Sequence, residues 1–500
     1  MLDFITRIND AVNGFVWGWP ALILLTVVGV LMTVLTKFYQ VSHLGHWWKN
    51  TIGAVFRDKE VTSHTEDKSI SQFQSLATAL AATVGTGNIV GVSGAIITGG
   101  PGAVFWMWLI AFFGMMTNFS ENVLGIYYRR KNINGEWSGG AMYYLRDGLG
   151  SYKNMKGVGK GLGILFSIFC VIASFGIGNM TQVNSISGNM ASVFHVPTWI
   201  TGVVVLFFAG LVIVGGLQRI AKVTEKIVPF MVLLYMIGAI VILVWNHHMF
   251  REVFGAIFHG AFAWKSAAGG VVGYGIKLAI EQGMKRGVFS NEAGLGSSVM
   301  VHSNSNVSEP VRQGMWGIFE VFADTWVVCT LTAFAVLSSG LVDLETGVAV
   351  TEFNGAELTK ANMISTVFSL HFGKFGAAFI AIAIMLFAFS TVLGWSHYGT
   401  KAWEYLFGTK ATMLYKVIFV VAIFGGAVMG DNLAWDLSDT FNGLMMIPNL
   451  IGVLALSPTV YRIVKNYVDR HMRNKDVEPM LSAFPEVQKE QEEKLARTGE

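Results

Sequence analysis

A polar, glycine-rich tetrapeptide, Gly85-Thr86-Gly87-Asn88, interrupts an otherwise apolar stretch over residues 71–97. The stretch exceeds the length of about 20 residues that a transmembrane helix needs. Its closely spaced glycines favour unwinding, and unwound backbone is tolerated at membrane depth only where it lines a cavity or is buried in protein. The sequence therefore predicts a helix broken at its midpoint that binds a small polar solute or an ion. The alternative is an unbroken glycine-rich helix that packs closely against its neighbours.

The free amide groups of this break are suited to bind a carboxylate. Glycine permits a close approach of the ligand to the backbone, and the half-helix that follows adds the positive end of its dipole. We therefore expect the N–H groups of Thr86, Gly87 and Asn88 to bind the carboxylate of a substrate. The side-chain carbonyl of Asn88 could also face a cation, or Asn88 could simply cap the second half-helix.

A second interrupted helix reads KRGVFSNEAGLG and begins at Lys285. Its polar residues Ser290, Asn291 and Glu292 could bind a substrate ammonium group through carbonyl and side-chain oxygens. Glu292 is the sharpest candidate, because a charged group within a membrane span costs about 2.5–3.5 kcal/mol on insertion scales and is usually retained for function. Glu292 could instead pair with the neighbouring Lys285 or Arg286.

The two breaks occupy equivalent positions of an internal repeat. A shift of 203 positions places Asn88 on Asn291 and Glu121 on Asp324, so 33 residues separate the amide from the carboxyl group in both halves. Because an odd number of expected spans, five, separates the breaks, the second half would be inverted in the membrane. Glu121 and Asp324 could carry a proton or an ion, or could form a structural hydrogen bond between helices.

Two broken helices that face one another at the midplane would present both kinds of binding group. The N-termini of the half-helices bring positive dipole ends and free N–H groups, and the C-termini bring carbonyl oxygens. An anion and a cation can then be held side by side. This arrangement suits an amino-acid zwitterion accompanied by Na+.

Three motifs resemble those of a known transporter family. They are residues 71–102 with their Gly-Thr-Gly-Asn centre, the run GVFSNEAG over residues 287–294, and the run FGIGN over residues 175–179. The likeness is to the alanine or glycine:cation symporter family and extends from the first to the last expected span. It implies an all-α leucine-transporter fold and Na+-coupled uptake of alanine or glycine by alternating access.

The resemblance also implies where the sodium ion binds. In related symporters an adjacent pair of hydroxyl groups faces carbonyls of the first broken helix, and here Ser390 and Thr391 match that pair while Ala81 and Val84 match the carbonyls. Hydroxyl and carbonyl oxygens suit a hard cation without adding charge. Together with Asn88 they form the expected Na+ site. The alternative is that each hydroxyl bonds a carbonyl of its own helix four residues earlier.

Four further residues are expected to form the wall of the substrate pocket: Phe175, Asn179, Gln182 and Trp395. Aromatic side chains would leave room for a methyl group but not for a larger side chain. Gln182 follows Phe175 by seven residues, so a regular helix would place both on one face. Ordinary helix packing is the alternative for each aromatic residue, and the resemblance favours the pocket for Phe175 and Trp395.

The composition is that of a polytopic membrane protein. The 500 residues are 53% hydrophobic and only 13% charged, and the mean hydropathy is +0.52. The net charge of +3 is small and the basic residues lie between apolar runs, which argues against nucleic-acid binding. The two cysteines cannot build a disulfide framework or a thiolate metal cluster. The sequence contains no Walker motif, Gly-x-Ser-x-Gly elbow, metal-binding spacing or repeated filter loop, so we expect no enzyme, no resident cofactor and no ion channel.

Hydropathy predicts eleven membrane spans. Basic residues concentrate in alternate loops, so the positive-inside rule places the N-terminus outside and the C-terminus in the cytoplasm of a plasma-membrane protein. The expected segments are a peripheral helix with its loop (1–70), a first five-helix repeat (71–262), an inverted second repeat (263–465) and a polar cytoplasmic tail (466–500) that is a solvated helix or disordered. The spans are residues 16–37, 71–97, 103–128, 162–193, 199–215, 227–245, 274–302, 312–337, 375–395, 414–429 and 437–460.

The expected mechanism is secondary active symport that needs no ATP. Na+ bound between the first break and the hydroxyl pair would hold the unwound conformation and complete the amino-acid site, so each ligand would raise the affinity of the other. The bundle of spans two, three, seven and eight would then rock against the other spans. Coupling to H+ through Glu121, Glu292 or Asp324 is the alternative within transporters. The expected partners are a small amino acid, Na+ and the lipid bilayer, and the sequence leaves the oligomeric state open.

Overall fold

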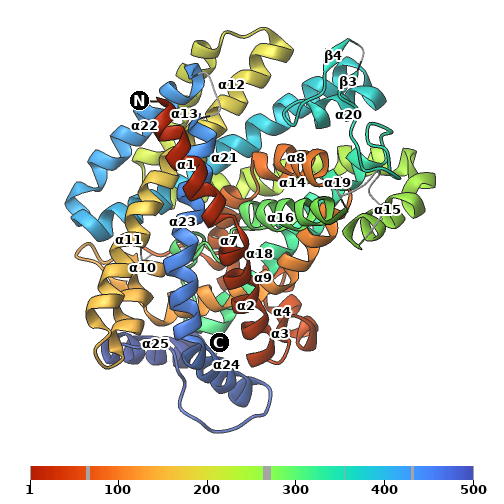
Figure 1. Cartoon of the computed structure of the whole chain (residues 1–500). Helices are drawn as coiled ribbons and strands as arrows, with labels where there is room; N and C mark the ends of the chain where they lie inside the picture. Colours follow the sequence, from red (N-terminus) through yellow and green to blue (C-terminus); the bar gives the residue numbers. More distant parts are fainter. Residues whose placement is uncertain (1, 64–67, 263–271, 354, 430–432, 499–500) are drawn as a thin grey trace.

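The structure is a computed structural model and describes residues 2–63, 68–262, 272–353, 355–429 and 433–498. It is all-α, as the sequence predicts (Figure 1). The strands in this part of the chain form two small antiparallel ribbons. They pair β1 (Arg130–Lys131) with β2 (Trp137–Ser138), and β3 (Glu352–Phe353) with β4 (Ala356–Glu357).

The helices before residue 263 include two that are interrupted by π-helical turns. The α-helices are α1 (Leu2–Val16), α2 (Trp19–Leu35), α3 (Tyr39–Ser42), α4 (Leu44–Asn50), α5 (Ile52–Val55), α6 (Lys59–Thr62), α7 (Gln72–Thr83), α8 (Val92–Gly99), α9 (Gly102–Tyr127), α10 (Ala141–Tyr143), α11 (Lys156–Phe175), α12 (Thr181–Phe194), α13 (Thr198–Val214), α14 (Leu217–Trp245) and α15 (Phe250–Phe262). The shorter turns are η1 (Gly87–Gly91), η2 (Tyr144–Gly148), η3 (Leu149–Ser151), η4 (Gly176–Met180) and η5 (His247–Met249).

The helices after residue 271 end in a helical tail. The α-helices are α16 (Val272–Asn291), α17 (Val299–His302), α18 (Pro310–Val321), α19 (Thr330–Leu337), α20 (Met363–Phe372), α21 (Lys374–Phe407), α22 (Thr412–Val428), α23 (Leu433–Ala455), α24 (Ser457–His471) and α25 (Pro485–Thr498). A π-helical segment, η6 (Phe322–Cys329), joins α18 to α19, and a single turn, η7 (Thr409–Ala411), precedes α22.

Each of the eleven predicted spans contains a helix of the structure. Among the described residues, seven helices are long and apolar enough to cross a membrane, and two bent pairs raise the number to nine. The remaining two predicted spans correspond to α13, which has 17 residues, and to the charged helix α16. On α16, Lys277 and Glu281 lie 3.7 Å apart and partly compensate one another.

The first predicted break is confirmed. A capping box starts α7, since the Ser71 hydroxyl accepts a hydrogen bond from the Gln74 N–H group (3.1 Å) and the Gln74 side chain accepts one from the Ser71 N–H group (3.2 Å). α7 ends at Thr83, and the helix continues through η1 and α8 after a bend of 51°. A Cβ atom on Gly85 would lie 2.5 Å from the Thr391 hydroxyl oxygen, so glycine allows α21 to approach the break closely.

The second predicted break is also confirmed. α16 ends at Asn291, and the short helix α17 begins only at Val299. Three residues between them have a positive φ: Glu292 (56°), Gly294 (90°) and Gly296 (72°). Glycine adopts this left-handed conformation freely, whereas a glutamate does so at a cost that the surrounding structure must compensate.

The broken helices lie in the middle of the molecule with α9 and α18 (Figure 1). α9 packs against both α16 and α18, and α7 packs against α14 and α21. The predicted boundary between the two repeats, at residues 262 and 263, falls at the edge of the undescribed segment 263–271. The division of the chain into those repeats therefore stays a prediction.

The described part of the polar C-terminal tail contains the helix α25, so the expected helix is confirmed and disorder is wrong. Most residues of α25 are exposed, although the tail also docks on other helices. α25 lies at the same end of the molecule as α24 (Figure 1). Leu481 and Gln491 are buried, and the Ala483 N–H group donates to the carbonyl of Tyr127 at the end of α9 (2.9 Å). The amino-acid composition of the tail does not predict this docking, because only a few of its side chains and backbone groups make the contacts.

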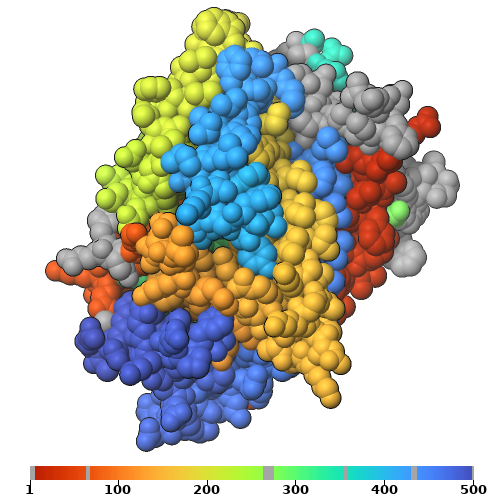
Figure 2. All heavy atoms as spheres, turned by 90° about the vertical axis from the view of Figure 1, so that its left-hand side faces the viewer, coloured from red at the N-terminus to blue at the C-terminus, as the bar shows by residue number. Residues whose placement is uncertain are grey.

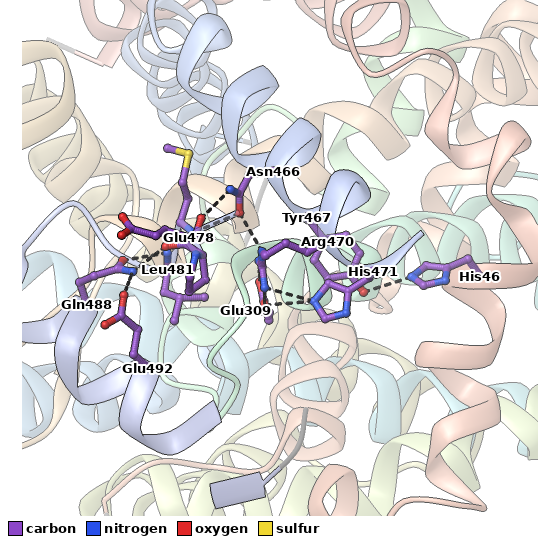
Figure 3. A network of polar contacts seen from close by, with 12 residues as sticks. His46, Glu309, Asn466, Tyr467, Arg470, His471, Glu478, Leu481, Gln488 and Glu492 are labelled. Atoms are coloured by element: carbon purple, nitrogen blue, oxygen red, sulfur yellow. Dashed lines mark hydrogen bonds and ion pairs between the residues drawn. The ribbon is translucent and has the colours of Figure 1, made fainter. Parts of the chain in front are cut away.

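A polar network fixes the tail to other helices (Figure 3). The Arg470 guanidinium bonds both carboxylate oxygens of the buried Glu309 at 2.6 and 2.9 Å, and His471 lies 3.2 Å from the same carboxylate. The Tyr467 hydroxyl lies 3.1 Å from Nε2 of His46 on α4. Burial, together with the charge of nearby histidines, lowers the pKa of His46 to about 4, so its ring is neutral at pH 7.

Candidate functional site

Asn88 rearranges the backbone hydrogen bonds of the first break. The Gly85 N–H group donates to the Asn88 side-chain oxygen (2.9 Å), and the Asn88 N–H group donates to the Gly85 carbonyl (3.3 Å). In an uninterrupted helix these two N–H groups would bond the carbonyls of Ala81 and Val84, four residues earlier. Both carbonyls are thus released from their helical partners. The alternative that Asn88 caps the second half-helix is wrong, because its side-chain oxygen turns back to Gly85.

The hydroxyl pair on α21 lies against this released backbone. The Ser390 hydroxyl oxygen is 3.3 Å from the Ala81 carbonyl oxygen and 2.8 Å from the Phe387 carbonyl oxygen of its own helix. The Thr391 hydroxyl donates to the same Phe387 carbonyl (3.0 Å). Thr391 thus makes the bond expected to its own helix four residues earlier, whereas Ser390 bonds the carbonyl three residues earlier and also faces the break.

The residues expected to hold Na+ therefore converge at the end of α7. Ala81, Val84, Ser390 and Thr391 are all buried, and Val84 ends the helix with a ψ of 86°, outside the helical range. Their oxygens are neutral, which is the donor chemistry that suits a hard monovalent cation. The side-chain oxygen of Asn88, the fifth expected ligand, already accepts the Gly85 N–H group.

Asp324 on η6 joins the two breaks. Its carboxylate accepts hydrogen bonds from the Asn88 amide (2.6 Å) at the first break and from the Ser290 hydroxyl (2.8 Å) at the second. The Thr325 hydroxyl adds a third bond (2.8 Å), and Thr325 also accepts from the Asn291 amide (3.1 Å). Asp324 is fully buried, so three donors compensate the loss of water around it.

Glu121 on α9 is the counterpart of Asp324 at the second break. Its carboxylate accepts a hydrogen bond from the Asn449 amide and interacts with the backbone N–H groups of Gly294 and Gly296. Asn449 also donates to the Gly294 carbonyl (2.9 Å). The acid of each half therefore contacts the break of the other half, which matches the symmetric spacing of the sequence. These contacts favour the structural interpretation of both acids.

Glu292 is buried and hydrogen-bonded within the second break. Its carboxylate accepts from the Ser297 hydroxyl (2.5 Å), and the Trp395 side chain lies against it. Lys285 pairs instead with Asp439 on α23, at 2.7 Å. The alternative that Glu292 pairs with Lys285 is therefore wrong, because α16 directs Lys285 toward α23.

Gln182 on α12 reaches the first break. The Thr86 hydroxyl donates to the Gln182 side-chain oxygen (3.0 Å), and the Gln182 amide donates to the Ile177 carbonyl (2.9 Å). This second bond fixes the amide orientation and directs its oxygen to the break. Gln182 thus joins α12 to the residues that were expected to bind the substrate carboxylate.

Phe175 and Asn179 are turned toward α22. The Phe175 ring centroid lies 5.4 Å from that of Tyr415 and 5.6 Å from that of Phe419, and the Asn179 amide donates to the Phe419 carbonyl (2.7 Å). The expectation that Phe175 and Gln182 share a helix face is wrong. The π-helical turn η4 lies between them, and its longer hydrogen-bond step rotates the face relative to an α-helix.

A cavity of about 440 Å³, which we call the break cavity, reaches the first break from one side. Thr86 and Gly87 line it together with Arg286, Phe289 and Lys360. The Phe289 ring lies 3.4 Å from the position of a Cβ on Gly87, so it covers the backbone of the break. The Arg286 guanidinium carbon lies 5.3 Å from the centre of the same ring. The cavity thus gives a polar solute a positively charged route to the break.

Sequence analysis missed a buried acid and histidine beside the second break. His302 Nε2 lies 2.9 Å from a Glu320 carboxylate oxygen, and both side chains are fully buried. The Gln313 amide lies 2.5 Å from His302 Nδ1, and because an amide N–H donates, the Nε2 atom carries the proton toward Glu320. The available signal was Glu320, a carboxylate inside the predicted eighth span.

Comparisons with known proteins agree with this geometry. A family model described as "Sodium:alanine symporter family" matches residues 2–481. The "Sodium/alanine symporter AgcS" of Methanococcus maripaludis is 43% identical over 466 residues, which cover 93% of this chain and 98% of that protein. The "Probable sodium/glutamine symporter GlnT" of Bacillus subtilis is 35% identical over 478 residues, which cover 95% of this chain and 93% of that protein.

A solved structure supports the architecture. The crystal structure of MhsT in complex with L-phenylalanine has a TM-score of 0.53 and 14% sequence identity, and the match covers 80% of this chain and 99% of that chain. At this identity the likeness shows the fold alone, which is the leucine-transporter fold that the sequence predicts. On the extent of the family match and the identity to its members, the chain belongs to the sodium:alanine symporter family.

Proposed function

We propose that this protein takes up alanine or glycine together with Na+ by alternating access. Membership of the family establishes Na+-coupled amino-acid symport as the activity and a membrane transporter, not an enzyme, as the protein class. The observation that carries the specific proposal is the first break, where released backbone carbonyls lie beside the Ser390 hydroxyl. Protein oxygens and free amides are thus available side by side for a cation and a zwitterion.

In this proposal the substrate carboxylate binds the N–H groups of Thr86 and Gly87. The Asn88 N–H group contributes less than the sequence suggests, because it already donates to Gly85. Ser290, Asn291 and Glu292 use their side chains within the protein, so the substrate ammonium group binds backbone carbonyls of the second break. Gln182, Trp395 and Phe289 restrict the space for the substrate side chain, which favours alanine and glycine over larger amino acids.

The coupling follows from the position of the ion. Na+ held by Ala81, Val84, Ser390 and Thr391 keeps the first break unwound, and the same unwound segment presents the amides that bind the substrate. Each ligand therefore raises the affinity of the other by the same factor. The bundle that contains both breaks moves as one unit in this proposal, because Asp324 joins them.

The proposed orientation places the N-terminus outside and the C-terminal helix in the cytoplasm of the plasma membrane. The distribution of basic loops supports this orientation. The break cavity then opens to the outside, and α24 and α25 lie on the cytoplasmic face. Lipid surrounds the exposed apolar residues of α13, α14 and α22.

H+ coupling is the second candidate, and the buried pair of Glu320 and His302 favours it. A buried carboxylate that changes its protonation state between two conformations would couple transport to pH. In that case a pH gradient would drive uptake of alanine in the absence of Na+.

Uptake of alanine into proteoliposomes tests the proposal. We expect a Na+ gradient at constant pH to drive accumulation, and a pH gradient without Na+ to drive none. Ser390→Ala should raise the Na+ concentration for half-maximal uptake about tenfold, because one of few oxygen ligands is lost. Ser167→Ala is the matched control, since Ser167 is a buried serine that bonds the Gly163 carbonyl of its own helix (2.8 Å). Equal uptake under a pH gradient alone would reject Na+ coupling.

A further inference from the structure

A second polar cavity, of about 340 Å³, lies at the opposite end of the first broken helix from the break cavity. Lys68, which precedes α7, lines this tail-side cavity, whereas Gly94 on α8 lines the break cavity. Its walls come from α13, α14, α21 and α22, from the loop between β1 and β2, and from Lys68 and Asn304, which lie before α7 and after α17. Figure 2 views the face of the molecule on which the light-blue α22, the yellow-green α13 and α14 and the orange segments meet.

The tail-side cavity carries more positive than negative side chains. Lys68, Lys401 and Lys416 line it, with Glu136 and Glu404 as the acidic residues. Lys401 pairs with Glu404 at 3.0 Å, and Lys68 donates to the Asn134 carbonyl. Lys416 forms no ion pair with any residue that the structure describes. Lys416 is therefore available to bind an anion.

A buried histidine nitrogen indicates independently that the cavity holds a ligand with a hydrogen-bond donor. His397 lines the tail-side cavity, and only 4% of its surface is exposed. Its ring donates a hydrogen bond to the Met300 carbonyl through Nδ1, and its Nε2 atom, which is therefore an acceptor, has no hydrogen-bond partner among the described residues. Buried polar atoms in native proteins almost always have a partner, so this nitrogen indicates a bound group.

We propose that the tail-side cavity is a second amino-acid site, which receives the substrate after it leaves the central site. The carboxylate binds between Lys416 and Lys401, and the ammonium group faces Glu136 and donates to the unprotonated Nε2 of His397. This inference rests on the proposed function for the identity of the ligand. It deepens that function by assigning a Na+-independent site on the release side.

Position and charge favour an amino acid over other anions. Ser396 and His397 line the cavity and directly follow Trp395 on α21, and Trp395 lies against Glu292 of the second break, so α21 connects the central site to the cavity. The two carboxylates of the walls would repel a phosphate dianion, whereas a zwitterion uses both charges of the site. The volume exceeds that of alanine, so binding should be weak enough for release.

Equilibrium binding in Na+-free choline buffer tests the proposal with purified full-length protein. Saturation-transfer NMR should detect alanine binding in the millimolar range, and acetate, methylamine and inorganic phosphate should all bind more weakly. Lys416→Gln should weaken alanine binding about fivefold, because one charge near the carboxylate is removed. Lys410→Gln is the matched control, since Lys410 is exposed on η7, the turn before the same helix, and lies outside the cavity.

Two further variants keep the test decisive. Lys416→Arg should retain alanine binding, and Glu136→Gln should reduce the preference for alanine over acetate without weakening acetate. Absence of Na+-free alanine binding to the wild type, or an equal loss in Lys416→Gln and Lys410→Gln, would overturn the proposal. Phosphate binding tighter than alanine binding would also overturn it and would identify an anion site for phosphate or lipid headgroups.

Counterflow in proteoliposomes separates this inference from the proposed function. Lys416→Gln should raise the half-saturating alanine concentration on the tail side about fivefold and leave the value on the other side unchanged. A wild type without Na+-driven uptake would reject the proposed function, while the Na+-free binding measurement would still report on the cavity. Equal shifts on both sides would contradict a separate release site.

Discussion

At the scale of single residues, Asp324 determines how the two broken helices are held together. It accepts one hydrogen bond from each break, and each bond comes from a side chain next to the point of interruption. Because the carboxylate is fully buried, water does not replace a lost partner. The two breaks are therefore expected to keep their relative position when the bundle moves.

Asp324→Asn should weaken this connection. The new amide would place an N–H group against one of the existing donors, and a buried unsatisfied group costs about 1–3 kcal/mol. We expect a lower unfolding temperature of the purified protein and slower Na+-driven alanine uptake. Asp58→Asn is the control, because Asp58 caps the exposed helix α6 and asparagine caps equally well.

The same variant distinguishes the two coupling ions. If Asp324 is structural, Na+-driven uptake persists at a reduced rate and its dependence on pH does not change. A selective loss of pH-dependent uptake at unchanged thermal stability would instead show that Asp324 carries a proton.

Several residues of the site could be predicted because their chemistry is unusual for a membrane span. Gly85, Asn88 and Glu292 disturb an apolar helix locally, and the structure places all three at breaks. The partners of those residues could not be predicted, since they depend on the packing of distant segments. The orientation of Phe175 was also not predicted. The π-helical turn η4 directs its ring toward α22, and no sequence pattern indicates this turn.

At the scale of elements, the docked tail stabilises the contact between α24 and the start of α18. Glu309 precedes α18, and Arg470 and His471 of α24 bind its carboxylate. Lys494 of α25 donates to the carbonyl of Asn306 in the same loop. The tail therefore holds the connection between the second broken helix and α18.

Arg470→Gln should release the tail. Glu309 would lose its principal partner while buried, which destabilises the docked state by roughly 1–3 kcal/mol. Limited trypsin cleavage at Lys489 and Lys494 should become about tenfold faster. Arg473→Gln is the control, because its partner Asp469 lies at 2.9 Å and the Arg473 side chain is 51% exposed. Unchanged cleavage in Arg470→Gln would show that the ion pair does not hold the tail.

The docked tail should also resist moderate acid. Burial opposes ionisation of Glu309, but hydrogen bonds from His471 and Arg470 outweigh burial and hold its pKa below the usual value of 4.5. A group with a lowered pKa stabilises the folded form above its unfolded pKa, and this contribution is lost as the pH falls through the lowered value. Cleavage of the wild-type tail should therefore be constant between pH 8 and about pH 5.

The elements themselves follow largely from the sequence. Hydropathy located a helix for every predicted span, because apolar runs long enough to cross lipid leave few alternatives. The helix of the tail was predicted but its docking was not, because its polar composition is that of a solvated helix. Its docking depends on Tyr127 and Glu309, which lie far away along the chain.

At the scale of the whole molecule, an ion pair connects α16 to α23 near Arg286 and Lys360, two residues that line the break cavity. Lys285 on α16 lies 2.7 Å from Asp439 on α23, and the Trp17 indole donates to the Asp439 carbonyl (2.9 Å). The side chains are only 15% and 13% exposed, so water replaces the pair poorly. The bond is expected to oppose separation of α16 from α23.

Lys285→Gln should shift the protein toward conformations in which the break cavity is more open. A cysteine introduced as Asn189→Cys lines that cavity, and the native Cys170 and Cys329 are buried. We expect labelling of the new cysteine by a charged thiol reagent to become about threefold faster. Lys277→Gln is the control, since Lys277 is 48% exposed and pairs more loosely. Equal labelling rates in both variants would show that this ion pair does not restrain opening.

The Asn88 side chain accepts the Gly85 N–H group, and in the proposed function this bond makes the selectivity for the ion independent of the selectivity for the amino acid. If Na+ binds as we propose, backbone geometry fixes the spacing of its oxygen ligands, and substitutions in the proposed pocket wall should change the size of the accepted solute while this spacing stays the same. The same fold could therefore transport different amino acids in different family members while Na+ remains the coupling ion. The names of two relatives, a sodium/alanine symporter and a probable sodium/glutamine symporter, agree with this expectation.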